Sequence, residues 1–139
     1  MTDQELIEKA IAAKEYAYAP YSNFRVGAAL LTGDGTVYTG CNIECASYGG
    51  TNCAERTAIF KAVSDGKKDI KKIAIVSDLE DYTFPCGICR QVINEFGSEI
   101  EIVLANKEKE IKTFRMEEIL PYSFSGNDLE KNKKNQKEG

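Results

Sequence analysis

The chain has 139 residues, of which 42% are hydrophobic and 29% charged, and this is the size and composition of one ordinary globular domain. Its formal net charge of −4 argues against a nucleic-acid-binding protein, because such proteins normally present a basic face to the phosphates. No apolar run approaches the roughly 18 residues of a membrane span, and the acidic start Met1-Thr2-Asp3-Gln4-Glu5 is unlike a secretory signal, so we expect a cytoplasmic protein with no membrane partner.

The first predicted element is a helix over residues 3–17. Thr2 and Glu5 have the spacing of a capping box, and apolar residues follow at helical intervals. The helix is expected to stop before Pro20, because the residue ahead of a proline avoids the helical conformation.

A hairpin is predicted next. Residues 24–31 and 37–41 read as two strands, joined by the tight turn Gly33-Asp34-Gly35. Residues 42–52 lack any periodicity and read as an ordered loop. Thr51 or Asn52 is the expected N-cap of the helix that follows.

The rest of the chain alternates between strands and helices. The predicted helices cover residues 53–64, 86–96 and 116–120, and the predicted strands cover 70–77, 100–105 and 111–114. Such alternation indicates an α/β domain, here a three-layer α/β/α arrangement with a mixed sheet of about five strands. We assign residues 1–128 to this domain and expect the Lys-rich residues 129–139 to form a charged, disordered tail.

The five cysteines and the absence of histidine point to thiolate metal binding. Cytosolic thiols are kept reduced, so cysteines at short spacing are more probable metal ligands than disulfide partners. Cys86 and Cys89 are one helical turn apart, and Cys53 stands at the start of another helix. Three thiolates leave one position of a tetrahedral zinc ion open, which is typical of a catalytic site. We therefore predict one Zn²⁺ per chain.

Two charged residues beside Cys53 suggest what the metal site does. Glu55 can accept a proton from a zinc-activated water and pass it on, a task that falls to a carboxylate in a chain without histidine. Arg56, one helical turn after Cys53, is placed to donate hydrogen bonds to the sulfurs and to offset their negative charge. Arg90 is the cation beside the second cysteine motif.

Other interpretations of these residues remain open from spacing alone. The Cys86-x-x-Cys89 pair is compatible with a redox dithiol, but that reading leaves Cys53 and Glu55 without a role. A fourth cysteine, Cys41 or Cys45, would close a structural, non-catalytic zinc-binding module, which leaves Glu55 and Arg56 unexplained.

The two motifs resemble a known enzyme family. Cys53-Ala54-Glu55 followed by Pro85-Cys86-Gly87-Ile88-Cys89 is the zinc-deaminase signature. The wider match, over about residues 5–128, is to the small homotetrameric bacterial cytidine deaminases, and it includes the segments Tyr21–Leu30 and Gly40–Glu44. The resemblance implies hydrolytic deamination of cytidine and deoxycytidine in pyrimidine salvage. An antibiotic-nucleoside deaminase of the blasticidin S type, which shares both zinc motifs, is the closest alternative.

The resemblance also implies a nucleoside site. Phe24, Asn42 and Glu44 are expected to line it, with the last two bonded to the ribose, while the backbone at Ala54 and Cys86 orients the base. Cys45 departs from the family, in which Asn is common after that glutamate.

The expected partner of the chain, besides the small nucleoside, is further copies of itself. A homotetramer with shared active sites is implied by the resemblance, and interfaces favour aromatic side chains such as those in the loop 46–50 and the segment 121–124. Tyr48 and Phe124 are the candidate residues for contacts that complete a neighbouring site.

Overall fold

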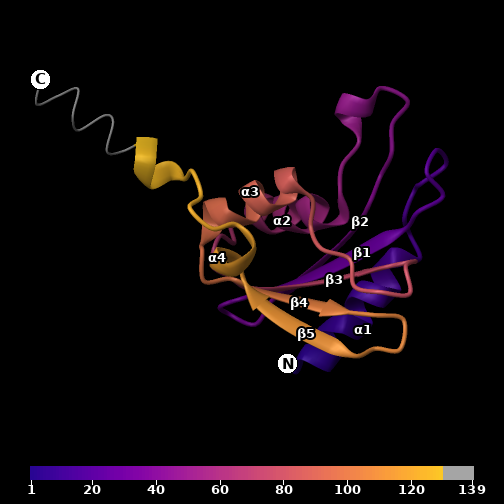
Figure 1. Cartoon of the computed structure of the whole chain (residues 1–139), viewed down its shortest axis with the longest axis horizontal. Coiled ribbons are helices and arrows are strands. Elements are labelled where there is room, and N and C mark those ends of the chain that lie inside the picture. Colours follow the sequence, from indigo (N-terminus) through magenta and orange to yellow (C-terminus); the bar gives the residue numbers. More distant parts are fainter. Residues whose placement is uncertain (130–139) are drawn as a thin grey trace, which may run out of the picture.

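The computed structural model describes residues 1–129 of the chain, so the predicted tail lies outside the described residues apart from Leu129. Figure 1 shows a central sheet with helices above and below it. The helices are α1 (Asp3–Lys14), α2 (Ala54–Ser64), α3 (Gly87–Phe96) and α4 (Met116–Ile119), with a short 3-10 helix, η1 (Tyr48–Gly50). The strands are β1 (Val26–Thr32), β2 (Val37–Cys41), β3 (Ile70–Ser77), β4 (Glu101–Ala105) and β5 (Ile111–Arg115).

The five strands form one mixed sheet in the order β2-β1-β3-β4-β5. β3 and β4 run parallel, and the other neighbouring pairs are antiparallel. β1 and β2 form the predicted hairpin, with Leu31 opposite Val37 next to the turn. The sheet confirms the predicted fold class.

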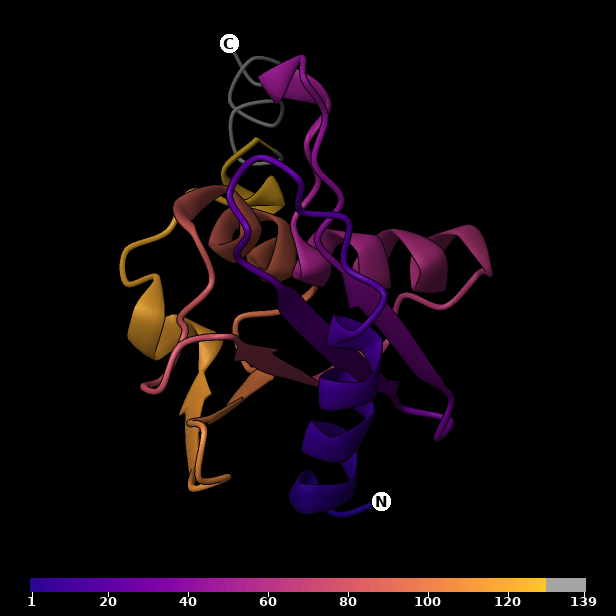
Figure 2. The ribbon, with the colours of Figure 1, turned by 90° about the vertical axis from the view of Figure 1, so that its right-hand side faces the viewer.

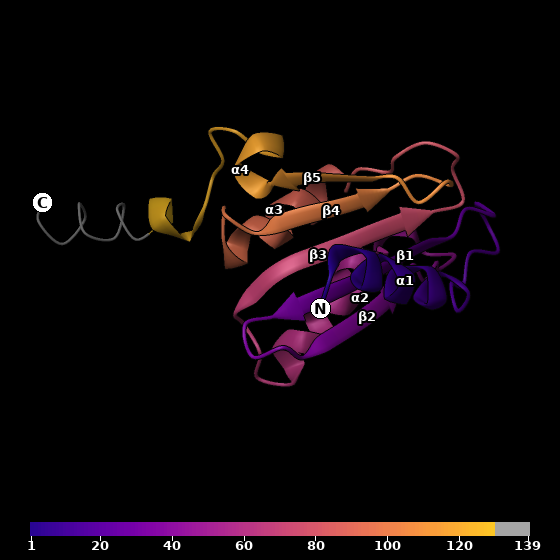
Figure 3. The ribbon, with the colours of Figure 1, turned by 90° about the horizontal axis from the view of Figure 1, so that it is seen from below.

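Successive residues of the central strands face two separate cores. Ala28 and Leu30 of β1 pack with the core beneath α2, α3 and α4, whereas Ala29 packs with the core that α1 covers. Figure 3 shows α1 in front of the sheet and α2 and α3 behind it. The alternation follows from the two-residue period of a strand, and it gives the three layers that the sequence predicts.

Two glycines allow the helices to lie close against the sheet. A Cβ atom at Gly27 would stand 2.1 Å from the carbonyl oxygen of Ala10 in α1, and one at Gly40 would stand 2.5 Å from that of Ala54 in α2. A side chain at either position would push a helix outward. Gly40 therefore helps to set the position of the first turn of α2.

The first helix is shorter than predicted. It begins as expected, with the Thr2 hydroxyl accepting the Glu5 N–H, but it ends at Lys14 and not at residue 17. Tyr18 instead pairs with the loop after β2: its N–H donates to the carbonyl of Asn42 at 3.0 Å, and its carbonyl accepts the Glu44 N–H at 2.8 Å. Figure 2 shows this segment beside the loop that carries η1.

Two boundaries near the site also differ from prediction. β1 begins at Val26 rather than at residue 24, because Asn23 takes a left-handed conformation (φ 56°) that turns the chain first. The N-cap of α2 is Cys53, with extended backbone angles, and not Thr51 or Asn52. Within residues 1–129, no helix combines the length and apolar character needed to cross a bilayer.

Candidate active site

Two helix starts bring three sulfur atoms together. Cys53 and Cys86 are the N-caps of α2 and α3, and Cys89 lies in the first turn of α3. The three sulfurs lie within 4.8 Å of one another, and those of Cys53 and Cys86 are 3.9 Å apart. Zinc–sulfur bonds of about 2.3 Å in a tetrahedron place two sulfurs about 3.8 Å apart. The three side chains therefore fit one zinc ion and leave its fourth position open.

Arg56 supplies positive charge to these sulfurs. Its Nη2 atom donates to Cys53 Sγ at 3.3 Å, while its buried Nε has no hydrogen-bond partner among the described residues. Hydrogen bonds from the Cys89 thiol and from Arg56 lower the pKa of Cys53 to about 5, although its partial burial opposes the shift. A sulfur that is ionised at neutral pH is the form that binds metal.

Arg90 has a different role from that of Arg56. Its Nε donates to the carbonyl of Pro85 at 2.7 Å, and its Nη1 donates to that of Ile119 at 2.8 Å. Arg90 thus ties the residue before Cys86 to the end of α4. It supports the backbone that carries the ligand rather than the sulfur itself.

Glu55 is buried beside the metal ligands. Its side chain is only 4% exposed, and burial together with the nearby Cys53 sulfur raises its pKa. In a regular helix, residues two positions apart point about 200° apart. Cys53 escapes this restriction because its extended N-cap conformation precedes the first helical residue. Cys53 and Glu55 can therefore line one pocket.

A cavity of about 310 Å³ joins the metal ligands to the predicted nucleoside residues. Cys53, Cys86 and Glu55 line it together with four of the expected nucleoside residues: Phe24, Asn42, Glu44 and Ala54. Lining residues that the sequence did not predict for the site are Ser22, Val26, Thr51, Asn52, Thr83 and Phe84. Of these, Ser22 stands next to Glu44, and its signal in the sequence was its place in the family-like segment Tyr21–Leu30, two residues before Phe24.

Asn42 holds the chain from Phe24 to the first residue of β1, Val26. Its Nδ2 donates to the carbonyl of Phe24 at 2.8 Å, and its Oδ1 accepts the N–H of Val26 at 2.9 Å. Asn42 is buried, so these bonds satisfy both ends of an amide that would otherwise be costly to bury. Asn42, which the sequence predicts to bind the sugar, thus also fixes the backbone at Phe24 and Val26, which line the same cavity.

Tyr48 and Phe124 lie outside this cavity. Tyr48 is 84% exposed at η1 and lines a neighbouring hollow together with Cys45. Phe124 is 60% exposed, and its carbonyl accepts a hydrogen bond from Gln91 of α3 at 2.6 Å. Neither ring reaches the pocket of its own chain.

Cys41 and Cys45 do not join the metal ligands. In the part of the chain that the structure describes, Cys53, Cys86 and Cys89 form the only cluster of three or more potential metal-binding side chains. Cys41 is half-buried at the end of β2, and Cys45 is exposed in the following loop. The geometry therefore favours an open site with three sulfurs over a closed site with four.

Comparison with known proteins finds relatives both in sequence and in structure. Residues 1–105 match the family model described as the cytidine and deoxycytidylate deaminase zinc-binding region. A protein of Sporosarcina psychrophila named cytidine deaminase is 51% identical over 93% of this chain and 96% of its own, and one of Halalkalibacterium halodurans is 50% identical over 93% and 98%. The crystal structure of cytidine deaminase from Burkholderia pseudomallei, at 50% identity, superposes with a TM-score of 0.86 over 89% of this chain and all of that one.

Proposed function

The chain belongs to the cytidine and deoxycytidylate deaminase family, and we propose that it converts cytidine or deoxycytidine and water into the uridine product and ammonia, with Glu55 as the proton carrier. The observation that carries the proposal is the pocket itself. In it, a buried carboxyl group and the sulfurs of two metal ligands line the same cavity as Phe24, Asn42 and Glu44. This arrangement supports hydrolysis of a nucleoside over the two alternative interpretations of the cysteines, a redox dithiol and a structural zinc-binding module.

Glu55 accounts for the proton movements of this reaction. When bound, the zinc ion activates the attacking water. As the water oxygen bonds to C4 of the pyrimidine, the Glu55 carboxylate takes up a water proton and delivers it to N3. The second proton passes from the hydroxyl now on C4 through Glu55 to the exocyclic amine; the C4–N bond breaks, the C4 carbonyl forms, and ammonia leaves. Burial raises the pKa of Glu55, which makes its carboxylate a better proton acceptor than an exposed one.

The remaining pocket residues bind and orient the nucleoside. The ring of Phe24 provides an apolar face for the pyrimidine, and Asn42 and Glu44 provide polar groups for a sugar hydroxyl. The backbone at Ala54 and Cys86 lies at the two helix starts, next to the metal ligands, where it is suited to hold the base with C4 towards the zinc position.

The direct test is turnover of cytidine by the purified protein, followed by the ultraviolet change on conversion to uridine. We expect activity that a zinc chelator removes and that added zinc restores. Protein that contains one zinc per chain but leaves cytidine, deoxycytidine and blasticidin S unchanged would refute the proposal and support a structural zinc module. Turnover of blasticidin S alone would assign the site to the antibiotic nucleoside.

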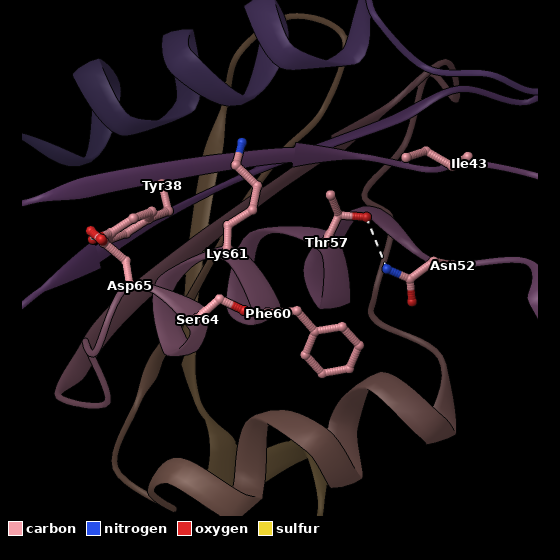
Figure 4. A pocket seen from close by; sticks show the side chains of 8 residues that line it. All are labelled: Tyr38, Ile43, Asn52, Thr57, Phe60, Lys61, Ser64 and Asp65. Atoms are coloured by element: carbon pink, nitrogen blue, oxygen red, sulfur yellow. Dashed lines mark hydrogen bonds between the residues drawn. The ribbon is translucent and has the colours of Figure 1, made fainter.

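We propose in addition that the working form is a homotetramer. A wide depression of about 630 Å³ lies over the exposed side of α2 and the edge at β2 (Figure 4). Phe60 of α2 and Ile43 of the loop after β2 line it and are 48% and 45% exposed. Together with the exposed rings of Tyr48 and Phe124, these side chains give the chain the aromatic and apolar surface that subunit interfaces favour.

The assembly is tested by light scattering or sedimentation of active protein. A mass near 15.4 kDa, that of one chain, would refute the homotetramer. Phe60→Glu places a charge in the depression and should lower both the mass and the activity. Phe124→Ala should weaken nucleoside binding without releasing zinc if its ring completes a neighbouring site, and normal kinetics in this variant would exclude that role.

A cytoplasmic location is also proposed. The zinc site needs three reduced thiols, and the cytoplasm is the compartment that keeps cysteines reduced. Recovery of the activity in the membrane or secreted fraction of fractionated cells would contradict it.

A further inference from the structure

Glu44 is already hydrogen-bonded within the protein before any nucleoside arrives. Its Oε1 atom accepts the backbone N–H groups of Tyr21 and Ser22, at 3.0 and 3.1 Å. Its Oε2 atom accepts the hydroxyl of Ser22. A carboxylate offers about four acceptor positions, so these three bonds leave one, on Oε2.

The Ser22 hydroxyl makes two hydrogen bonds. Its oxygen accepts the N–H of Phe24 at 3.1 Å, and its single hydrogen is donated to Glu44. The left-handed backbone at Asn23, with φ of 56°, makes the tight turn that brings Ser22 and Phe24 into this contact. The orientation of the hydroxyl is thus set by the chain that carries the Phe24 ring.

We infer that Ser22 is a positioning residue for sugar recognition: its hydroxyl holds the Glu44 carboxylate so that the remaining acceptor position of Oε2 takes one ribose hydroxyl. Ser22 and Glu44 both line the active-site cavity, which places this contact at the nucleoside. The inference rests on the proposed role of Glu44 at the sugar.

The charge state of Glu44 is consistent with this arrangement. The hydrogen bond from the Ser22 hydroxyl is the largest of the effects that lower its pKa, and the two backbone N–H groups add to it. Glu44 is therefore a carboxylate at neutral pH and can only accept hydrogen bonds, so its partner on the nucleoside must be a donor such as a hydroxyl.

The test compares two nucleosides in the Ser22→Ala enzyme. For cytidine, we expect KM to rise by about 3- to 15-fold, because one hydrogen bond to a partly exposed carboxylate is lost, while kcat and zinc content stay close to wild type. For 2′,3′-dideoxycytidine, which offers no ring hydroxyl to Glu44, we expect most of this rise to be absent. Ser22→Thr retains the hydroxyl and should restore the KM for cytidine.

Control variants distinguish the positioning role of Ser22 from the sugar-binding role of Glu44. Ser98→Ala, at an exposed position between α3 and β4, should leave both nucleosides unaffected. Combined with Glu44→Gln, Ser22→Ala should add little further loss, because both changes act on one interaction. If the wild-type enzyme does not distinguish the two nucleosides, Glu44 itself does not read the sugar. If it does distinguish them, but Ser22→Ala raises KM equally for both or for neither, the positioning role of Ser22 is refuted.

Discussion

Replacement of Glu55 by glutamine tests the centre of the proposed mechanism. Glutamine has nearly the same shape as glutamate, so it fills the same buried space and creates no cavity that would disturb α2. It cannot accept a proton from water or deliver one to the base. The change therefore removes the proton carrier and leaves the three sulfur ligands, Cys53, Cys86 and Cys89, in place.

The expected loss is large because Glu55 serves more than one step. A general acid–base group typically contributes about 10²- to 10⁴-fold, or about 2.7–5.5 kcal/mol of barrier. Among residues 1–129, the only other Asp or Glu that lines this cavity is Glu44, whose carboxylate is hydrogen-bonded by Ser22, so we expect no substitute carrier and a loss towards the upper end of that range.

The assay is the steady-state rate of cytidine conversion by protein whose zinc content has been measured on the same sample. We expect Glu55→Gln to keep one zinc per chain and to bind cytidine. Glu95→Gln, a matched change at an exposed position of α3, should retain the wild-type rate. If Glu55→Gln keeps more than about a tenth of that rate with its zinc bound, Glu55 is not the proton carrier.

Three further predictions concern the metal ligands, the sugar site and acid stability. Cys45→Ser should leave the zinc content unchanged, and loss of metal in this variant would favour a four-sulfur site. Glu44→Gln should raise KM for cytidine by about 10- to 150-fold with zinc retained, since an ionised acceptor is lost; an unchanged KM would remove Glu44 from the sugar site. Partial burial alone would raise the pKa of Asp78, but hydrogen bonds from Arg25 and Lys14 lower it from 3.8 to about 2. This pair of pKa values means that Asp78 stabilises the fold above about pH 4 and that its contribution fades as the pH falls towards 2. Asp78→Asn should therefore lower the free energy of unfolding at pH 7 by about 2 kcal/mol and by much less at pH 2, as measured by denaturant titration; an equal loss at both pH values would contradict the ionic explanation.

Local signals in the sequence were sufficient for the fold class and for the three cysteines that the structure brings together. Strand and helix periods follow from which residues are apolar, and this pattern located β2 and β3 at the observed residues. The spacing of Cys86 and Cys89 on one helical turn, with Cys53 at another helix start, indicated a shared metal before any contact between α2 and α3 was known. These cysteines are visible locally because each stands at or next to a helix start, where the helix dipole favours the thiolate that binds metal.

Only the tertiary structure decided where those local elements meet and end. α1 stops at Lys14 because Tyr18 pairs with the loop after β2, a contact between segments that are remote in sequence. The same crossing brings Ser22 to Glu44, over a separation of 22 residues, and creates a hydrogen bond that no periodicity or motif encodes. Hydrophobic patterning specifies which face of an element is buried, but the partners of a polar loop side chain depend on how the sheet places distant loops side by side.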